Sequence, residues 1–176
     1  NMKSSQALMI IDAQVNMFDE NFSIYQGDRI IKILSLLIDK ARAKGVSAIY
    51  VRNNGGEGEP DEVGTEGWEI HPAILPRAKE TVIDKQGADA FENTNLREIL
   101  EEENIKELII AGMQTEVCIE STTKRAIELG YKIVLVEDGH STFDFDDMNA
   151  IDEINRVNRE LRPLVNLLKA ENIELN

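Results

Sequence analysis

The sequence predicts an α/β domain built on a parallel β-sheet. Short, continuous apolar runs alternate along the chain with longer segments in which apolar residues recur at helical spacing. The first unit, from Gln6 to Val51, reads strand, helix, strand. Such a unit places its two strands in parallel through a right-handed crossover. The 176 residues contain no internal repeat or low-complexity linker, so we expect one domain over residues 1–176.

The expected strands are buried on both faces. Their apolar runs cover Gln6–Ile11, Val46–Val51, Thr81–Asp84, Ile105–Ala111 and Tyr131–Glu137, and a short last strand is expected at Asn172–Leu175. Continuous rather than alternating apolar runs suit strands with helices on both sides of the sheet. The pattern therefore indicates three layers, with the sheet in the middle.

The expected helices alternate with these strands. They cover Asp28–Gly45, about Leu96–Glu103, Ile119–Leu129 and about Asp147–Leu168. Gly45 is the expected stop of the first helix, because glycine tolerates the left-handed conformation of a helix C-terminus. Pro163 is expected to kink or split the last helix, because proline removes a backbone donor.

Composition excludes several classes of function. The formal net charge of −14 argues against a nucleic-acid-binding surface. No apolar run is long enough to span a membrane, and no signal peptide is recognised. A single cysteine excludes a disulfide framework, so a cytoplasmic location is expected. A small molecule remains the expected partner.

Reactive side chains gather at the strand ends. Four residues fall at the carboxyl ends of predicted strands: Asp12, Lys85, Cys118 and Asp138. Ligands of open α/β sheets bind at this edge, so an acid, a lysine and a cysteine can converge there. A thiolate attacks an electrophilic carbon, and a nearby carboxylate can take the thiol proton and pass it to a leaving group. A neighbouring ammonium would orient the carboxylate and favour the thiolate.

The turn around Cys118 has the character of a reactive site. The segment Gly112–Cys118 joins an apolar strand to a helix. The positive end of that helix would favour a thiolate, and backbone N–H groups of the turn could hold a developing oxyanion. The alternative is a buried structural cysteine, which is common in cytoplasmic proteins.

The segment from Arg52 to Pro76 is long, irregular and rich in glycine and proline. Loops of this length in compact domains are usually functional or mobile. Trp68 either anchors this loop or forms a wall of a substrate pocket, and the sequence leaves both interpretations open. His71, which precedes Pro72, is expected to be structural.

Three stretches resemble the isochorismatase-like cysteine hydrolases, a family that includes nicotinamidases, N-carbamoylsarcosine amidases and true isochorismatases. They are Leu8–Gln14 with Phe18, Val82–Lys85 with Asp89–Phe91, and Gly112–Cys118, and Asp138–Thr142 also looks like the family. Each motif is modest alone. Their order on successive strand ends makes the resemblance specific.

The resemblance implies a Rossmann-like, three-layer αβα fold with a six-stranded, mostly parallel sheet. It implies Cys118 as nucleophile, Asp12 as general base and acid, and Lys85 as the ion-pairing third member. It also implies a cis peptide bond near Met113–Gln114, with Gln114 and Cys118 in the oxyanion turn. A homodimer or larger homo-oligomer is implied as well.

Two departures from the family pattern reduce the range of reactions and cofactors that we expect for this chain. Nicotinamidases carry an Asp-x-His element after the second strand, whereas this chain reads Val51–Gly56 there, without a histidine. With only two histidines, no metal site and no cofactor are expected. True isochorismatases cleave a vinyl ether and often lack the cysteine, so Cys118 favours attack on a carbonyl.

We therefore predict a cysteine hydrolase that cleaves an amide or related C–N bond of a small molecule. The candidate pocket residues are Gln14, Phe18, Trp68 and Phe91. Two alternatives stay open. One keeps the fold and hydrolyses a vinyl ether as an isochorismatase does, and the other is a catalytically idle binding or regulatory protein on the same scaffold.

Overall fold

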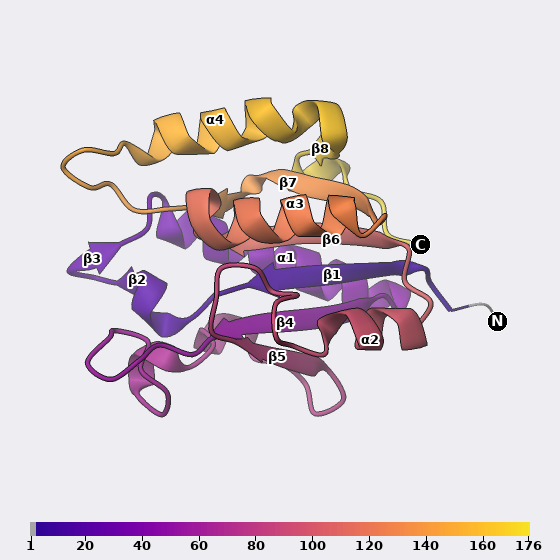
Figure 1. Cartoon of the computed structure of the whole chain (residues 1–176), viewed down its shortest axis with the longest axis horizontal. Helices are drawn as coiled ribbons and strands as arrows, with labels where there is room; N and C mark the ends of the chain where they lie inside the picture. The colour runs from indigo at the N-terminus through magenta and orange to yellow at the C-terminus, as the bar shows by residue number, and fades with distance from the viewer. Residues whose placement is uncertain (1–2) are drawn as a thin grey trace.

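A computed structural model describes residues 3–176. Its centre is a six-stranded sheet with the strand order β5-β4-β1-β6-β7-β8 (Figure 1). The strands are β1 (Gln6–Ile11), β4 (Ser47–Asn53), β5 (Thr81–Lys85), β6 (Glu107–Met113), β7 (Lys132–Ser141) and β8 (Asn166–Leu168). All neighbouring strands of this sheet pair in parallel. The predicted three-layer α/β fold is confirmed, and residues 1 and 2 of the expected domain lie outside the described part.

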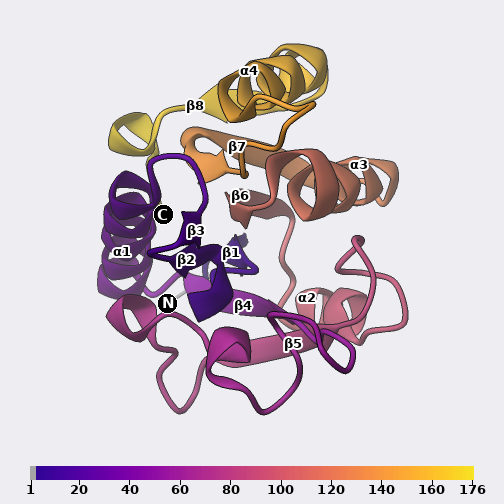
Figure 2. The same cartoon turned by 90° about the vertical axis from the view of Figure 1, so that its left-hand side faces the viewer.

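Helices cover both faces of the sheet (Figure 2). Helix α1 (Gly27–Lys44) packs on one face, against a core that includes Leu8 and Ile10 of β1. On the other face lie α2 (Leu96–Glu102), α3 (Glu120–Glu128) and α4 (Ala150–Leu161), against a core that includes Met9 and Ile11. Alternate residues of β1 thus face opposite layers, and every residue of the strand is buried, as its continuous apolar run predicts.

In the first half of the chain, a strand and a helix end appear where the sequence predicts them. Strand β1 has the predicted bounds, and α1 ends at Gly45, which has φ 68° and whose N–H caps Ala41 and Arg42. A side chain at Gly45 would be strained in this left-handed conformation, so glycine is the residue that suits this helix end.

The second half departs from the prediction at two places. Strand β7 runs on to Ser141 through a bulge, so that Gly112 of β6 pairs with His140. Asp138 therefore lies within the strand instead of after it. The interpretation of Asp138 as a strand-end residue was wrong, because a bulge adds residues that an apolar run does not reveal.

The last strand was also placed wrongly. Helix α4 ends at Leu161, a 3₁₀ turn follows at Arg162–Leu164 around Pro163, and β8 then pairs with β7. The expected strand at Asn172–Leu175 does not form. Its apolar side chains, Ile173 and Leu175, instead enter the core on the α1 face.

Two segments extend beyond the carboxyl ends of the strands. One is a small antiparallel hairpin, β2 (Phe18–Asp19) with β3 (Phe22–Ser23), which no sequence signal indicated. The other is the irregular segment after β4, with short 3₁₀ turns at Glu66–Trp68 and Pro72–Ile74. The hairpin and the first part of the segment after β4 lie at the left of Figure 1, opposite the chain termini. Among residues 3–176, no helix has the length and apolar character that crossing a membrane requires.

Candidate active site

Three strand ends bring Asp12, Lys85 and Cys118 together. The Lys85 Nζ atom lies 3.0 Å from Asp12 Oδ2 and donates a hydrogen bond to Cys118 Sγ at 3.2 Å. All three residues are buried, with Asp12 and Lys85 each 1% exposed and Cys118 7% exposed. The convergence follows from topology, because β1, β5 and β6 are parallel and end at the same edge.

The local backbone positions two of these groups. Asp12 follows β1 with φ 51°, a left-handed conformation that aspartate tolerates better than most residues, and its N–H bonds to Val51 O at 2.8 Å. Gly112 pairs with Ile11 and has φ 127°. A Cβ atom at Gly112 would collide with the Ile11 backbone, so only glycine allows β6 to approach β1 here.

Cys118 lies in a single π-helical turn, Thr115–Ile119, immediately before α3. The peptide bond between Met113 and Gln114 that precedes the turn is cis, as the resemblance implies. Gln114 O accepts hydrogen bonds from the N–H groups of Val117 and Ile119. The turn thus holds Cys118 between the end of β6 and the start of α3.

Electrostatics at the site favour a neutral thiol. Burial, together with the neighbouring Asp12 carboxylate, raises the pKa of Cys118 to about 12, and Lys85 opposes this only in part. Burial also raises the pKa of Asp12 despite the Lys85 ammonium. The thiolate expected from the helix start is therefore not the resting form, because burial and a nearby negative charge outweigh the helix terminus.

The ion pair holds Lys85 in its charged form. Burial acts to lower the pKa of Lys85, but Asp12 and Cys118 outweigh it, so that the net shift is upward. Asp12 Oδ1 has no hydrogen-bond partner in residues 3–176. The cluster therefore combines a carboxylate with a free acceptor atom, an ammonium and a thiol, which is the set that general-base activation of a nucleophile needs.

Asn53 extends the cluster and was missed by sequence reasoning. Its Oδ1 accepts a hydrogen bond from Lys85 Nζ at 3.1 Å, and its Nδ2 donates to Asp61 Oδ2 at 2.6 Å. Asn53 is the last residue of β4. The strand-end rule that selected Asp12 could have found it, had the strand been extended beyond Val51.

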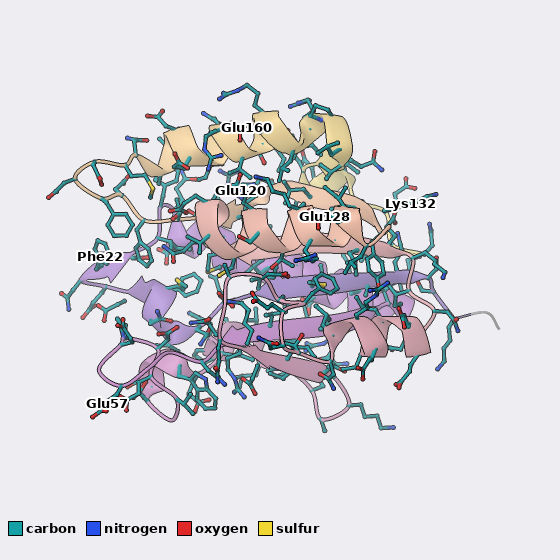
Figure 3. The ribbon with its side chains drawn as sticks, viewed as in Figure 1. Phe22, Glu57, Glu120, Glu128, Lys132 and Glu160 are labelled. Carbon is teal, nitrogen blue, oxygen red and sulfur yellow. The ribbon has the colours of Figure 1, made fainter. Side chains whose placement is uncertain are left out.

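A cavity of about 980 Å³ opens over the cluster. Asp12, Asn53, Gln114 and Cys118 contribute to its lining, together with residues of the β2–β3 hairpin, the segment after β4, the segment after β5 and the segment after β7. Phe22 of the hairpin lies at the end of the molecule where this cavity opens (Figure 3). The cavity is large enough for a small-molecule ligand.

The four residues predicted to line a substrate pocket lie outside this lining. Gln14 is fully buried, and its side chain joins the Asn53 backbone to Trp68 O. Trp68 anchors the loop, since its Nε1 donates to Asn54 Oδ1 and its ring lies 3.8 Å from Arg52 Cζ. Phe18 packs edge-on against His71, and Phe91 packs against Tyr131. Each of the four side chains packs against other parts of the chain instead of lining the cavity.

A buried polar chain supports the Cys118 turn. Asn158 Nδ2 donates to Glu137 O, which leaves Asn158 Oδ1 to accept from His140 Nε2 at 2.7 Å. His140 Nδ1 then accepts from the Thr115 hydroxyl at 2.9 Å. Burial lowers the pKa of His140 to about 4, so the ring is neutral and this tautomer satisfies both nitrogens.

Asp138 does not join the site. Its Oδ1 accepts from Ala170 N, and Arg29 lies 3.9 Å from its Oδ2. Asp138 lines a separate cavity next to α1 and α4. In residues 3–176, no group of three or more His, Cys, Asp or Glu side chains is arranged to hold a metal ion.

Comparison with known proteins identifies the family. Residues 6–162 match the model of the isochorismatase domain. A streptothricin hydrolase from Streptomyces noursei is 32% identical over 139 residues, which cover 79% of this chain but 55% of that protein. The chain thus spans about half the length of the streptothricin hydrolases it matches.

Two further relatives match over most of their length. A ureidoacrylate amidohydrolase from Agrobacterium fabrum is 26% identical, over 77% of this chain and 75% of that protein. The crystal structure of an isochorismatase from Pseudomonas putida superposes with a TM-score of 0.90 at 27% identity, over 98% of this chain and 92% of that one. The chain therefore belongs to the isochorismatase family of hydrolases.

Proposed function

We propose that the protein is a cysteine hydrolase that cleaves an amide or related C–N bond of a small molecule through a thioester at Cys118. The observation that carries the proposal is the Asp12–Lys85–Cys118 cluster, joined by contacts of 3.0 and 3.2 Å in the floor of the cavity. A thiol that lines a cavity, beside an ammonium that also contacts a carboxylate, belongs to a set of groups suited to acyl transfer.

In the first step, Asp12 takes the proton of the Cys118 thiol as the sulfur attacks the substrate carbonyl. As the S–C bond forms, the negative charge passes from Asp12 through the sulfur to the carbonyl oxygen, while the Lys85 ammonium lies beside both the carboxyl group and the sulfur. The raised pKa of Asp12 makes its carboxylate a better proton acceptor than an exposed one. Backbone N–H groups of the turn from Gln114 to Cys118 receive the oxyanion.

In the second step, the proton held by Asp12 passes to the leaving nitrogen as the C–N bond breaks. This leaves a thioester at Cys118 and frees the amine. Asp12 then takes a proton from water, which attacks the thioester carbon. The acid leaves, and the proton returns to the Cys118 sulfur, so that the enzyme is restored.

The names of two relatives support C–N cleavage. One is a ureidoacrylate amidohydrolase and the other a streptothricin hydrolase. The family also contains proteins named isochorismatases, and vinyl ether hydrolysis needs a proton donor but no thioester. Cys118 in the cavity floor favours the acyl mechanism over that alternative.

The test compares the parent with Cys118→Ala and Cys118→Ser on ureidoacrylate, streptothricin, a panel of simple anilides, and isochorismate. We expect an amide to be turned over by the parent and at least about a thousandfold more slowly by both variants, since they lack the nucleophile. Intact mass after rapid acid quenching should show an acyl adduct on the parent alone.

Other outcomes would contradict the proposal. Isochorismate turnover that survives Cys118→Ala would assign ether hydrolysis. A thiol that alkylating reagents leave unmodified, with a rate indifferent to Asp12→Asn and Lys85→Met, would indicate an idle binding scaffold. Circular dichroism of each variant checks that lost activity does not reflect lost folding.

A further inference from the structure

The side chains that line the cavity carry charge of one sign. Besides Asp12, four acidic residues contribute to the lining: Asp19, Glu59, Asp61 and Glu66. Among the described residues 3–176, no lysine, arginine or histidine contributes to the lining. A ligand entering the cavity is therefore surrounded by carboxylates from the hairpin and from the long segment after β4.

These four carboxylates have no cationic side chain to neutralise them. Within residues 3–176, none of them forms an ion pair with a lysine, arginine or histidine. Asp61, which is half-buried, bonds to the neutral Asn53 amide, and its charge contributes to raising the pKa of Asp12. The charge of Asp61 therefore acts on the reacting groups.

Three phenylalanine rings also line the cavity. Phe22 and Phe143 stack with ring centroids 4.7 Å apart, and Phe145 lies 5.8 Å from Phe22 and 6.0 Å from Phe143. All three line the cavity, and Phe22 is 53% and Phe145 46% exposed. Aromatic faces attract cations through their quadrupole, and they do so for organic cations as well as for ammonium groups.

The acidic residues do not suit a metal ion. Among residues 3–176, no three carboxylate, cysteine or histidine side chains are arranged to hold one. Carboxylates spread around a cavity that also exposes phenyl rings match a bulky cation whose charge is diffuse. Substituted ammonium and guanidinium groups have that chemistry.

We infer that the cavity selects amide substrates that carry a positively charged organic group, held between the loop carboxylates and the three phenylalanine rings. This inference rests on the proposed function and names its substrate class. The Lys85 ammonium at the cavity floor opposes it. It is 1% exposed and paired with Asp12, so its field in the cavity is largely offset.

The test uses the reactivity of Cys118, the single cysteine of the chain. Three methanethiosulfonates of known charge serve as probes: the trimethylammonioethyl, the methyl and the sulfonatoethyl reagents. Their second-order rates are measured by intact mass and divided by their rates with N-acetylcysteine. The resulting ratio of cationic to anionic labelling reports the electrostatic potential at the cavity floor without any turnover.

The main variant is Glu59→Gln/Asp61→Asn/Glu66→Gln. Its matched control, Glu98→Gln/Glu102→Gln/Glu171→Gln, removes the same net charge from exposed positions on α2 and the turn after β8. A second variant, Glu59→Gln/Glu66→Gln, spares Asp61 and its bond to Asn53, in case the triple substitution disturbs the loop.

We expect the parent to favour the cationic reagent over the anionic one by roughly tenfold or more at low ionic strength, and by less in 0.5 M salt. The ratio should fall several-fold in both loop variants and stay unchanged in the control. An anionic reagent that reacts as fast as the cationic one, or a ratio that survives neutralisation of the loop acids, would overturn the inference.

A second experiment distinguishes failure of this inference from failure of the proposed function. Three anilides of matched size carry a trimethylammonium, an uncharged or a sulfonate group on the acyl chain. Hydrolysis of all three at equal rates would overturn the charge selection and leave the proposed function standing. Hydrolysis of none, with the labelling preference intact, would count against the proposed function while the charge selection stood.

Discussion

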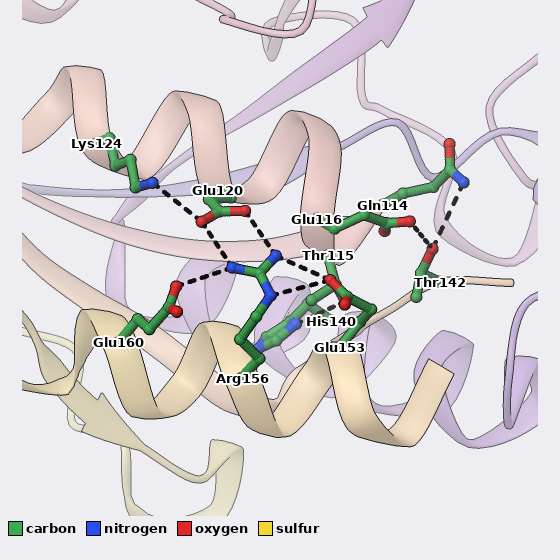
Figure 4. A network of polar contacts seen from close by, with 10 residues as sticks. All are labelled: Gln114, Thr115, Glu116, Glu120, Lys124, His140, Thr142, Glu153, Arg156 and Glu160. Carbon is green, nitrogen blue, oxygen red and sulfur yellow. Dashed lines mark hydrogen bonds and ion pairs between the residues drawn. The ribbon is translucent and has the colours of Figure 1, made fainter. Parts of the chain in front are cut away.

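The molecule contains two ionic clusters whose contacts have the same length but whose surroundings differ. In the cavity floor, Lys85 lies 3.0 Å from Asp12, and their side chains are 0% and 2% exposed. Across α3 and α4, Arg156 lies 3.0 Å from Glu120, with its side chain 30% exposed (Figure 4). Arg156 also bonds to Glu153 and Glu160, and Lys124 bonds to Glu120.

The difference shows that burial, more than distance, decides what a charge pair does. Around Arg156, each partner favours the charged form of the other: the Arg156 hydrogen bond lowers the pKa of Glu120, and Glu120 raises the pKa of Arg156. In the cavity floor, burial raises the pKa of Asp12 although Lys85 is in contact. The partly buried cluster around Arg156 therefore stays ionised, whereas the fully buried one can pass a proton.

The largest change in stability is expected at Lys85, the cation of the buried cluster. The change Lys85→Met leaves the Asp12 carboxylate buried and unpaired, and we expect it to lower the free energy of unfolding by about 3–5 kcal/mol at pH 8. The loss should shrink as the pH falls, because a protonated Asp12 needs no partner. Urea unfolding at pH 8 and pH 5 measures both effects.

Its control is the double variant Asp12→Asn/Lys85→Met. Asparagine tolerates the φ of 51° at position 12, and the pair of substitutions removes both charges together. We expect it to recover most of the stability lost in Lys85→Met. Equal loss in the single and double variants would show that the cost comes from packing and not from an unpaired charge.

A second comparison concerns His140, which lies between the two clusters and is neutral. The pKa of His140 is about 4 in the folded protein against an ordinary value of 6.5. Between these values only the unfolded chain binds the proton, so stability rises with pH across this window and is complete above pH 6.5. The shift corresponds to roughly 3 kcal/mol lost between pH 7 and pH 4.

The variant His140→Gln isolates this effect, because other carboxylates also titrate in acid. Parent and variant are unfolded in urea from pH 4 to pH 8. We expect the parent to be more stable above pH 6.5 and the difference to narrow as the pH falls. A difference that is constant with pH would mean that protonation of His140 does not control the stability of the Thr115 turn.

The smallest effect is expected at Arg156. Arg156→Gln removes its three glutamate contacts at once, yet we expect a loss of only about 1 kcal/mol, because water screens charges at this exposure. The loss should fall further in 0.5 M salt. Thermal unfolding at low and high salt tests it, and a loss as large as that of Lys85→Met would remove the distinction between the clusters.

Sequence reasoning worked best where local chemistry decides structure. The apolar run of β1, the helical stripe of α1 and the stop at Gly45 appear in the structure as predicted. Strands β6 and β7 were placed within a few residues at either end, except that the bulge carries β7 on to Ser141. The apolar segment at 172–175 was mistaken for a strand because a buried coil and a buried strand look alike in sequence.

The residues of the candidate site also fall into those that sequence reasoning could select and those that it could not. Asp12, Lys85 and Cys118 were selected from the sequence because each ends or follows an apolar strand, and parallel strands share one carboxyl edge. Asn53, Asp61 and Phe22, which line the cavity, were not selected, whereas the candidates Phe18, Trp68 and Phe91 do not contribute to its lining. Loop side chains carry no periodic signal that shows which way they face.

The sequence by itself determined five strands of the sheet, its layers and the edge at which the thiol, the carboxylate and the ammonium meet, because periodicity and chain order control these features. Only the tertiary structure decided the protonation state of that cluster and the acidic, aromatic walls above it. The pKa of a buried group depends on how completely the packed chain excludes water. The walls depend on how the β2–β3 hairpin and the segment after β4 are held over the strand ends, for example by the hydrogen bonds of the buried Gln14.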